Sequence, residues 1–311
     1  MPELPEVETI KLGLQKYLIG HRIEGVDVRL PKIVQGNVKD IEGGKVIAVR
    51  RFGKGLVIDL DNDYSIAIHI KLTGQLIYRG PNLRQKVKLS KKVGGSLPNK
   101  WTHVIFKLKS QPVRQAQDKK TKVKSATQNS KATDAYLYYN DIRQFGWIRI
   151  VESSKLKDLS FFRDLGPEPP VTMSIGVQPL TLELFKKIVN SLNTAIKPLL
   201  MDQKRIGGIG NIYANDALFD AEIDPGRKAK SLSDAEIKKL YNSILKVLKI
   251  GLREEGASEL SFVNALGEEG SYQNHFLVYG REGQKCKRCN GIIKKIILGG
   301  RGTYFCPNCQ K

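Results

Sequence analysis

Apolar residues near the amino terminus recur at the three- and four-residue spacing of an amphipathic helix. They are Val7, Ile10, Leu14, Tyr17 and Leu18. Gly20 follows the last of them, and glycine commonly ends a helix because it tolerates left-handed backbone angles. The pattern therefore predicts a helix over Val7–Leu18.

Short runs rich in β-branched and aromatic residues follow this helix, as expected of strands. They cover Lys45–Arg50, Leu56–Leu60, Tyr64–Ile70, Trp101–Leu108, Tyr136–Tyr139 and Trp147–Val151. Asp61-Asn62-Asp63 supplies turn chemistry between the second and third runs. Several strands at this spacing are typical of a β-sandwich or barrel, and we expect the amino-terminal helix to pack against it.

The pattern changes from strands to helices after about Ser153. The Pro-rich stretch over residues 166–170 predicts a rigid linker. Ser233 and Glu236 form a capping box at the start of the longest helix, whose apolar residues follow one face. The predicted helices are Leu182–Leu192, Ile212–Phe219 and Asp234–Leu252, with a short turn near Pro198–Met201.

A Lys-, Gln-, Ser- and Thr-rich stretch over residues 109–134 interrupts the strand region. Its few large apolar residues cannot support a core, so it is interpreted as a solvated, disordered insertion between two strands. A tolerated surface loop is one explanation. A loose electrostatic arm for the DNA backbone is the other.

The charge of the chain indicates the class of its partner. Lys and Arg number 52 against 31 Asp and Glu, which gives a formal charge of +21 and a pI near 9.7. Nucleic acid fits this surplus, because each neutralised phosphate releases counterions; a ribosome or an anionic membrane would fit as well. No stretch approaches the ~20 apolar residues of a membrane helix, and the acidic start is not a signal peptide, so we expect a cytoplasmic protein.

The cysteines all lie in the last 26 residues of the chain. Two Cys-x2-Cys pairs separated by sixteen residues have the spacing of a zinc ribbon, whereas two disulfides would be reduced in the cytosol. Four protein thiolates leave no open position on the metal, so the predicted zinc is structural and single. Its ligands are Cys286, Cys289, Cys306 and Cys309.

The first residues allow two interpretations. Pro and acidic residues are favoured in the first turn of a helix, which alone explains Pro2, Glu3 and Glu6. Alternatively, removal of Met1 would make Pro2 a free secondary amine, and α-amino groups have pKa values near ~7.7–8.0, so a useful fraction is nucleophilic. Such an amine could form an iminium with a sugar carbon, with Glu3 as acid and base.

Two further features carry weaker signals. The glycine-rich turn over residues 207–213 precedes a helix and could bind a DNA phosphate, or it could simply join two helices tightly. Arg50, Arg51 and Lys54 lie on a strand and at its edge, where basic residues are usually solvated.

Taken together, these segments resemble the bacterial formamidopyrimidine-DNA glycosylases. The resemblance rests on MPELPEVET at the start and on four later motifs in the same order, and it covers nearly the whole chain except the Lys-rich insertion. Leu4 favours this branch over the related endonuclease VIII branch. The later motifs are LGPEP (Leu165–Pro169), GIGNIYANDALF (Gly208–Phe219), VYGREG (Val278–Gly283) and GRGTYFCPNCQ (Gly300–Gln310).

The resemblance implies a bifunctional DNA glycosylase and abasic-site lyase of base excision repair, which removes 8-oxoguanine and formamidopyrimidines and cuts the strand by β,δ-elimination. It implies that Pro2 forms the Schiff base, Glu3 is the general acid and base, Glu6 supports it, and Lys54 and Arg301 complete the catalytic group. The implied DNA-binding residues are His69, Lys71, Leu72, Arg143, Phe145 and Asn211.

The resemblance also implies a multidomain α+β fold. The expected division is an amino-terminal helix and β-sandwich over 1–152, a helix-two-turn-helix domain over 153–275 and a zinc finger over 276–311. We expect a monomer that binds damaged double-stranded DNA, has no small-molecule cofactor and no membrane attachment, and associates with the nucleoid of a bacterial cytoplasm.

Departures from the family pattern leave alternatives open. Leu72 stands where Met is usual, and Ile142 and Gln144 replace common Pro and Arg. The stretch Gly256–Tyr272 corresponds to a mobile loop that closes on the damaged base, and it lacks an Arg often found there. Specificity for oxidised pyrimidines and a non-catalytic, zinc-containing DNA-binding protein are therefore the alternatives.

Overall fold

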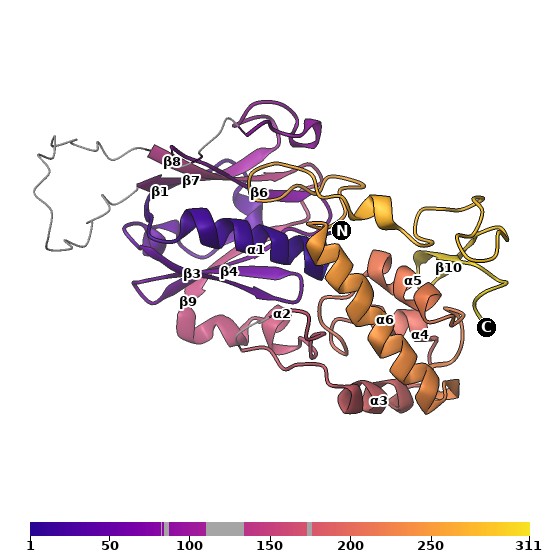
Figure 1. Cartoon of the computed structure of the whole chain (residues 1–311). Helices are drawn as coiled ribbons and strands as arrows, with labels where there is room; N and C mark the ends of the chain where they lie inside the picture. Colours follow the sequence, from indigo (N-terminus) through magenta and orange to yellow (C-terminus); the bar gives the residue numbers. More distant parts are fainter. Residues whose placement is uncertain (82, 84–86, 110–133, 173–175) are drawn as a thin grey trace, which may run out of the picture.

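The computed structural model describes residues 1–81, 83, 87–109, 134–172 and 176–311 (Figure 1). The predicted Lys-rich insertion falls almost entirely on residues 110–133, which lie outside the described residues. No helix in the described part of the chain is long and apolar enough to span a membrane. The 3₁₀ helices are Pro31–Ile33, Val38–Ile41, Lys91–Val93, Ser153–Asp158, Ala229–Ser231 and Tyr272–His275.

Two facing β-sheets form the amino-terminal half of the molecule. One has the order β1-β7-β8-β6 and the other β2-β9-β5-β4-β3; among the described strands of these sheets, β2 and β9 pair in parallel and the other pairs are antiparallel. The first sheet contains β1 (Arg22–Val28), β6 (Gly74–Arg79), β7 (Thr102–Lys109) and β8 (Asp134–Asp141). The second contains β2 (Val34–Gln35), β3 (Val46–Phe52), β4 (Gly55–Leu60), β5 (Tyr64–His69) and β9 (Trp147–Glu152).

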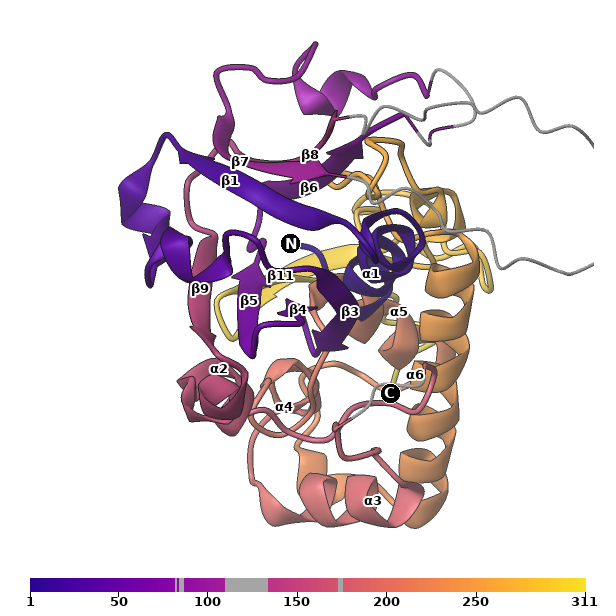
Figure 2. The same ribbon diagram turned by 90° about the vertical axis from the view of Figure 1, so that its left-hand side faces the viewer.

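Helix α1 (Leu4–Leu18) lies along the edge where the two sheets face each other (Figures 1 and 2). Its predicted apolar face is buried in one core with both sheets, including Val7, Ile10 and Leu14. The helix starts three residues earlier than predicted, because Glu3 and Glu6 form a capping box.

The six predicted strands are confirmed with small shifts in their ends, but β1, the two-residue β2 and β6 were missed. Strand β1 has little apolar alternation, and its pairing shifts between Ile23 and Gly25. A bulge of this kind breaks the period-two pattern on which strand prediction depends. The predicted sandwich with a packed helix is nevertheless the observed architecture.

The helical half forms a second core. The capping box of Ser233 and Glu236 is confirmed, with the Ser233 N–H donating to Glu236 at 2.8 Å. The segment predicted as a turn near residues 198–201 is instead part of a short helix. The helices are α2 (Ser160–Arg163), α3 (Leu182–Ser191), α4 (Ile196–Met201), α5 (Asn211–Asp220) and α6 (Asp234–Arg253).

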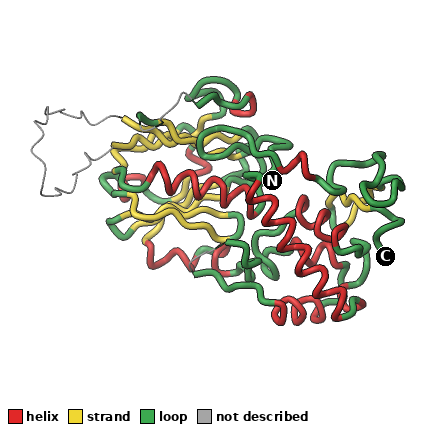
Figure 3. The backbone as a smooth tube through the Cα atoms, viewed as in Figure 1, coloured by secondary structure: helices red, strands yellow, loops and turns green. Residues whose placement is uncertain are grey.

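A two-stranded hairpin of β10 (Lys294–Leu298) and β11 (Arg301–Phe305) follows the helices and packs against α5. Figure 3 shows how helices dominate the region between the sheets and this hairpin. The order of sandwich, helices and hairpin agrees with the expected fold class. The domain boundaries at residues 152 and 275 stay a prediction. Phe262 and Ala265 precede the second boundary, yet they pack into the core of the sandwich.

Arg51 corrects the expectation that the basic residues of β3 are solvated. Its guanidinium is buried and lies 2.7 Å from a carboxylate oxygen of Glu8 and 2.6 Å from one of Glu168. Glu8 belongs to α1 and Glu168 to the Pro-rich linker, so this ion-pair group ties the sheets to the linker. Arg50 pairs with Asp59 at 2.6 Å.

We expect Arg51→Met to lower the free energy of unfolding by about 3–5 kcal/mol, because it removes the buried cation next to Glu168 and leaves Glu8 with Lys11 as its remaining partner. Urea unfolding followed by circular dichroism measures this loss. Arg50→Met is the matched control, since Arg50 is partly exposed and should cost about 1 kcal/mol or less. Equal losses in the two variants would contradict the role assigned to the buried group.

Candidate active site

The amino terminus lies where the sandwich and the helical half meet (Figure 1). Pro2 is buried, and it lines a narrow pocket together with residues from four distant parts of the chain. Burial lowers the pKa of the Met1 terminal amine below its usual value. An amine at this place is therefore more readily neutral. The other lining residues include Met1, Leu72, Ile212, Glu259 and Tyr279.

Glu3 is buried against the start of α5. Its carboxylate accepts hydrogen bonds from the backbone N–H groups of Gly210 and Ile212, both at 2.8 Å. This corrects the interpretation of the glycine-rich turn as an open phosphate site, because Glu3 is the anion that these amides bind. The contact fixes the carboxylate next to Pro2.

Glu6 lies in the first turn of α1, next to Glu3 at the start of the helix. Its carboxylate accepts hydrogen bonds from the Glu3 N–H at 2.7 Å, the Tyr213 hydroxyl at 2.8 Å and the Ala257 N–H at 2.7 Å. Burial raises the pKa of Glu6, and the nearby charge of Glu3 raises it further. Glu6 thereby connects α1, α5 and the loop that follows α6.

Lys54 is buried in the turn between β3 and β4. Burial lowers the pKa of its ammonium to about 8, although the charges of Glu3 and Glu6 oppose this shift. The preceding residue, Gly53, donates its N–H to Glu168 at 2.5 Å. The ion-pair group around Arg51 thus also fixes the turn that carries Lys54.

The end of β5 and the loop after it bring His69, Lys71 and Leu72 to the same region. The Lys71 N–H donates to His69 Nδ1 at 2.9 Å, and Lys71 has a left-handed backbone with φ of 50°. Burial, aided by the charges of Lys71 and Lys54, lowers the pKa of His69 to about 3, so this imidazole is neutral at pH 7. Leu72 lines the pocket beside Pro2.

Arg143 and Phe145 project from the turn between β8 and β9. The Arg143 guanidinium lies 4.8 Å from the centre of the Phe145 ring, whose residue is 57% exposed. Buried Asp141 accepts hydrogen bonds from the Gly146 N–H and from the Thr73 hydroxyl. The carboxylate of Asp141 therefore links this turn to the loop that carries Leu72.

Asn211 and Arg301 meet at the junction of α5 and the hairpin. The Asn211 side-chain amide donates to the carbonyl of Gly302 at 3.1 Å. Buried Lys197 donates to the same carbonyl at 3.1 Å and to the Thr303 hydroxyl at 2.7 Å. Arg301 is exposed beside this junction, so these bonds hold the backbone next to an exposed guanidinium.

The loop over residues 256–272 packs on β6 and covers the pocket beside Pro2. Gln75 donates to the carbonyl of Ser261 at 2.7 Å, and the Tyr78 N–H donates to the carbonyl of Ala265 at 2.8 Å. The Ser261 hydroxyl donates to the carbonyl of Leu72 at 3.1 Å. The loop and the Leu72 segment are therefore in direct contact.

The sequence did not single out Tyr213 or Tyr279 as site residues. Tyr213 donates to Glu6, and Tyr279 lines the pocket beside Pro2. Burial raises the pKa of Tyr213 well above its usual value, so its hydroxyl keeps its proton. Both residues lie inside motifs that were recognised as whole segments, but nothing in their spacing pointed to a pocket.

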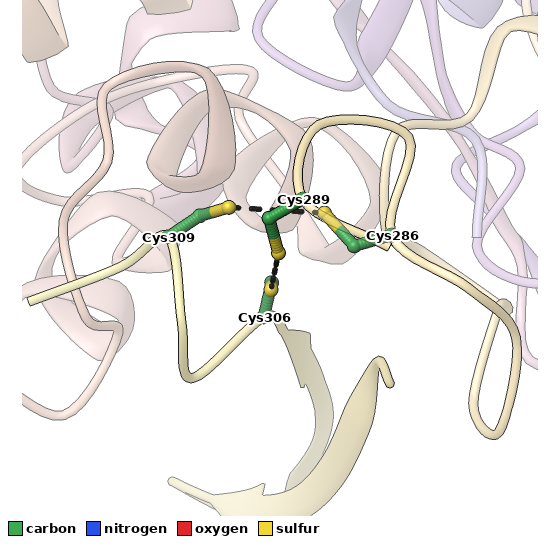
Figure 4. Close-up of side chains that lie close together, drawn as sticks. All are labelled: Cys286, Cys289, Cys306 and Cys309. Atoms are coloured by element: carbon green, nitrogen blue, oxygen red, sulfur yellow. Dashed lines mark hydrogen bonds between the residues drawn. The ribbon is translucent and has the colours of Figure 1, made fainter. Parts of the chain in front are cut away.

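The four cysteines converge from the turn before β10 and the turn after β11 (Figure 4). The Sγ atoms of Cys286 and Cys309 are 3.8 Å apart, and those of Cys289 and Cys306 are 3.5 Å apart. A tetrahedral zinc with bonds of ~2.3 Å holds its sulfur ligands roughly 3.8 Å apart, so these residues fit one zinc ion. All four coordination positions would be supplied by protein, which leaves no open position for a substrate.

Comparison with known families accounts for most of the chain. Residues 1–148 match the formamidopyrimidine-DNA glycosylase N-terminal domain and residues 165–262 the formamidopyrimidine-DNA glycosylase H2TH domain. Residues 283–311 match the zinc finger found in FPG and IleRS. A formamidopyrimidine-DNA glycosylase of Pelotomaculum thermopropionicum is 37% identical, over 100% of this chain and 99% of that protein.

Solved structures give the same result. The chain resembles the Lactococcus lactis Fpg bound to N7-benzyl-Fapy-dG DNA, with a TM-score of 0.78 and 28% identity over the whole of both chains. It also resembles the same wild-type protein bound to DNA that contains an oxidised pyrimidine, with a TM-score of 0.77 and 28% identity over both whole chains.

Proposed function

The chain belongs to the formamidopyrimidine-DNA glycosylase family, and from this premise we propose that Pro2 is the nucleophile and Glu3 the general acid and base of its reaction. The protein is a DNA glycosylase of base excision repair that binds damaged double-stranded DNA and contains one structural zinc. Abasic-site lyase activity is typical of the family. Action on chromosomal DNA would bring the protein to the nucleoid.

The reaction starts once Met1 has been removed and the Pro2 nitrogen carries a free electron pair. DNA glycosylases take the damaged nucleotide out of the helix stack, which exposes its C1′ atom. The Pro2 nitrogen bonds to C1′, the bond from C1′ to the base breaks, and the base leaves with that electron pair and gains a proton. Opening of the sugar ring gives an iminium, whose electron withdrawal permits β- and then δ-elimination of the two phosphates.

One observation carries this proposal: Pro2, Glu3, Lys54 and the narrow pocket covered by the 256–272 loop meet at one place. Backbone N–H groups of α5 hold the Glu3 carboxylate, so it can pass a proton without moving away. Arg301, Asn211 and Lys54 supply cationic and amide groups for the phosphates that flank the sugar. Leu72, Arg143 and Phe145 would fill the gap that the extruded nucleotide leaves.

Borohydride trapping tests the proposed reaction. We expect incubation with an 8-oxoguanine duplex and borohydride to give a covalent protein–DNA adduct. Absence of an adduct would support the non-catalytic alternative. Parallel trapping with a thymine glycol duplex measures lesion preference, and faster trapping there would indicate specificity for oxidised pyrimidines.

Intact mass supplies the companion measurement. The mature protein should lack the mass of Met1, because only then is the Pro2 amine free. A preparation that retains Met1 and still forms the adduct would contradict Pro2 as nucleophile.

We expect DNA binding to weaken as the pH rises through the pKa of Lys54. Because burial lowers this pKa to about 8, the charge that attracts phosphate is present below pH 8 and is lost above it. If binding needs the charged form, the apparent Kd for an abasic-analogue duplex should rise about tenfold from pH 7 to pH 9. Fluorescence anisotropy at constant salt measures it.

Lys54→Arg provides the control, since a guanidinium keeps its charge over this range and should flatten the profile. Burial also lowers the pKa of Lys197 to about 8. A pH dependence that persists unchanged in Lys54→Arg would therefore assign the effect to Lys197 and contradict this prediction.

A further inference from the structure

A second pocket, larger than the one beside Pro2, opens on the other side of the Leu72 loop. Its volume is about 500 Å³, within the range that holds small organic ligands. Figure 2 shows the elements around it, namely β9, α2 and the chain that leaves α4. We name it the Trp147 pocket, and its principal lining residues are Lys71, Trp147, Arg149, Phe161, Asp164 and Lys204.

Aromatic rings form the wall of the Trp147 pocket. The ring of Phe161 packs edge-on against Trp147, with centroids 5.7 Å apart, and against His69, with centroids 4.9 Å apart. The Arg149 guanidinium lies 5.3 Å from the centre of the Trp147 ring. Aromatic rings and guanidinium planes are the surfaces on which unstacked nucleobases pack in nucleic-acid-binding proteins.

The rim of the Trp147 pocket has a net positive charge. Lys71, Arg149 and Lys204 contribute cations, whereas Asp164 is the acidic residue of the lining. Asp164 already lies 3.3 Å from Lys204 and 3.0 Å from Arg163, and hydrogen bonds from these two cations lower its pKa. An aromatic wall with a cationic rim fits an aromatic base that carries a phosphate.

The loop that carries Lys71 and Leu72 separates the two pockets. Lys71 lines the Trp147 pocket, while its neighbour Leu72 lines the pocket beside Pro2. The bond from the Lys71 N–H to His69 and the left-handed backbone of Lys71 set these two side chains on opposite sides. A strand that crosses this ridge can present adjacent nucleotides to the two pockets.

We propose that the Trp147 pocket binds the nucleotide next to the lesion when that nucleotide is unpaired. The proposal rests on the proposed function, because it takes the pocket beside Pro2 as the lesion site. It predicts that the protein binds damage beside a mismatch or bubble more tightly than damage in a fully paired duplex.

The test uses the full-length protein with Trp101→Phe, which leaves Trp147 as its single tryptophan. Duplexes carry a tetrahydrofuran abasic analogue with the neighbouring nucleotide of the same strand either paired or unpaired, on the 5′ or the 3′ side. We expect one unpaired duplex to bind ~10-fold more tightly than the paired duplex, as stacking of one base allows. Only that duplex should quench the Trp147 emission strongly.

Arg149→Gln and Lys204→Gln should each remove most of this gain. Lys238→Gln is the matched control, because it removes one exposed positive charge on α6, away from the pocket, and should keep the gain. Equal binding and equal quenching by all duplexes would overturn the proposal, as would equal loss in Lys204→Gln and Lys238→Gln. Trapping of the paired 8-oxoguanine duplex separates the outcomes, since its failure would instead remove the proposed function.

Discussion

Pro2→Glu is expected to abolish both the glycosylase and the lyase reaction. A large second residue prevents removal of Met1, so the nitrogen at position 2 stays in a peptide bond and cannot form an iminium. Loss of a covalent nucleophile commonly lowers turnover by more than ~10³-fold. Borohydride trapping on 8-oxoguanine and abasic duplexes should therefore give no adduct above background.

Pro2→Gly is the informative partner of this variant. Glycine permits removal of Met1 and leaves a primary amine, so we expect weak residual trapping rather than none. Pro2 is buried, and thermal unfolding must therefore show that both variants remain folded. A variant with reduced activity and a normal melting temperature reports on chemistry.

Attack by the amine of Lys54 in place of Pro2 would contradict this prediction. Its buried amine, with a pKa lowered to about 8, has the property expected of a lysine nucleophile. If Pro2→Glu still forms an adduct, proteolysis and mass measurement of the trapped peptide would identify the attacking amine. An adduct on the peptide that contains Lys54 would show that the nucleophile lies in the β3–β4 turn and not at the amino terminus.

Local patterns predicted the elements of this fold well. The apolar spacing of α1, the capping box of α6 and the six strands each depend on residues close together in the sequence. Strand β6 was missed because its residues are buried on both faces, so apolar and polar positions do not alternate. Its role in holding the 256–272 loop depends on contacts with residues nearly two hundred positions away.

The site could be predicted as a set of residues but not as an arrangement. The sequence indicated an acid at position 3 and a glycine-rich turn at residues 207–210, each with a plausible separate role. Only their packing shows that the turn binds the acid. Arg51 illustrates the same limit, since its two carboxylate partners come from α1 and from the linker, far from β3.

Helix α5 connects the proposed catalytic site to the hairpin that is proposed to bind DNA. Its first turn binds Glu3, and Asn211 and Asn215 on the same helix bond to the hairpin, with Asn215 accepting the Tyr304 N–H at 2.8 Å. A displacement of the hairpin would therefore act on the helix end that positions the catalytic carboxylate. Zinc would therefore affect catalysis only through these contacts, because four protein thiolates leave it no open position for the substrate.

Cys289→Ser is expected to remove zinc and tight DNA binding together. The hairpin has a very small core of its own, and structural zinc supplies roughly 10–16 kcal/mol of folding free energy in isolated fingers. Without the metal, Arg301 and the neighbouring cations of β10 lose their fixed positions. Because charged hydrogen bonds contribute about 1.5–3 kcal/mol each, loss of two phosphate contacts should weaken binding by ~100-fold or more.

Zinc content by elemental analysis and the Kd for an abasic-analogue duplex measure the two effects on one preparation. Arg301→Gln is the matched control, because it should keep the zinc and lose only its own phosphate contact. The bonds from Lys197 and Asn211 to the hairpin do not involve the metal, so they provide the competing explanation. If Cys289→Ser lacks zinc yet binds DNA as tightly as the parent, these contacts alone hold the hairpin in place, and the structural role of zinc in DNA binding is wrong.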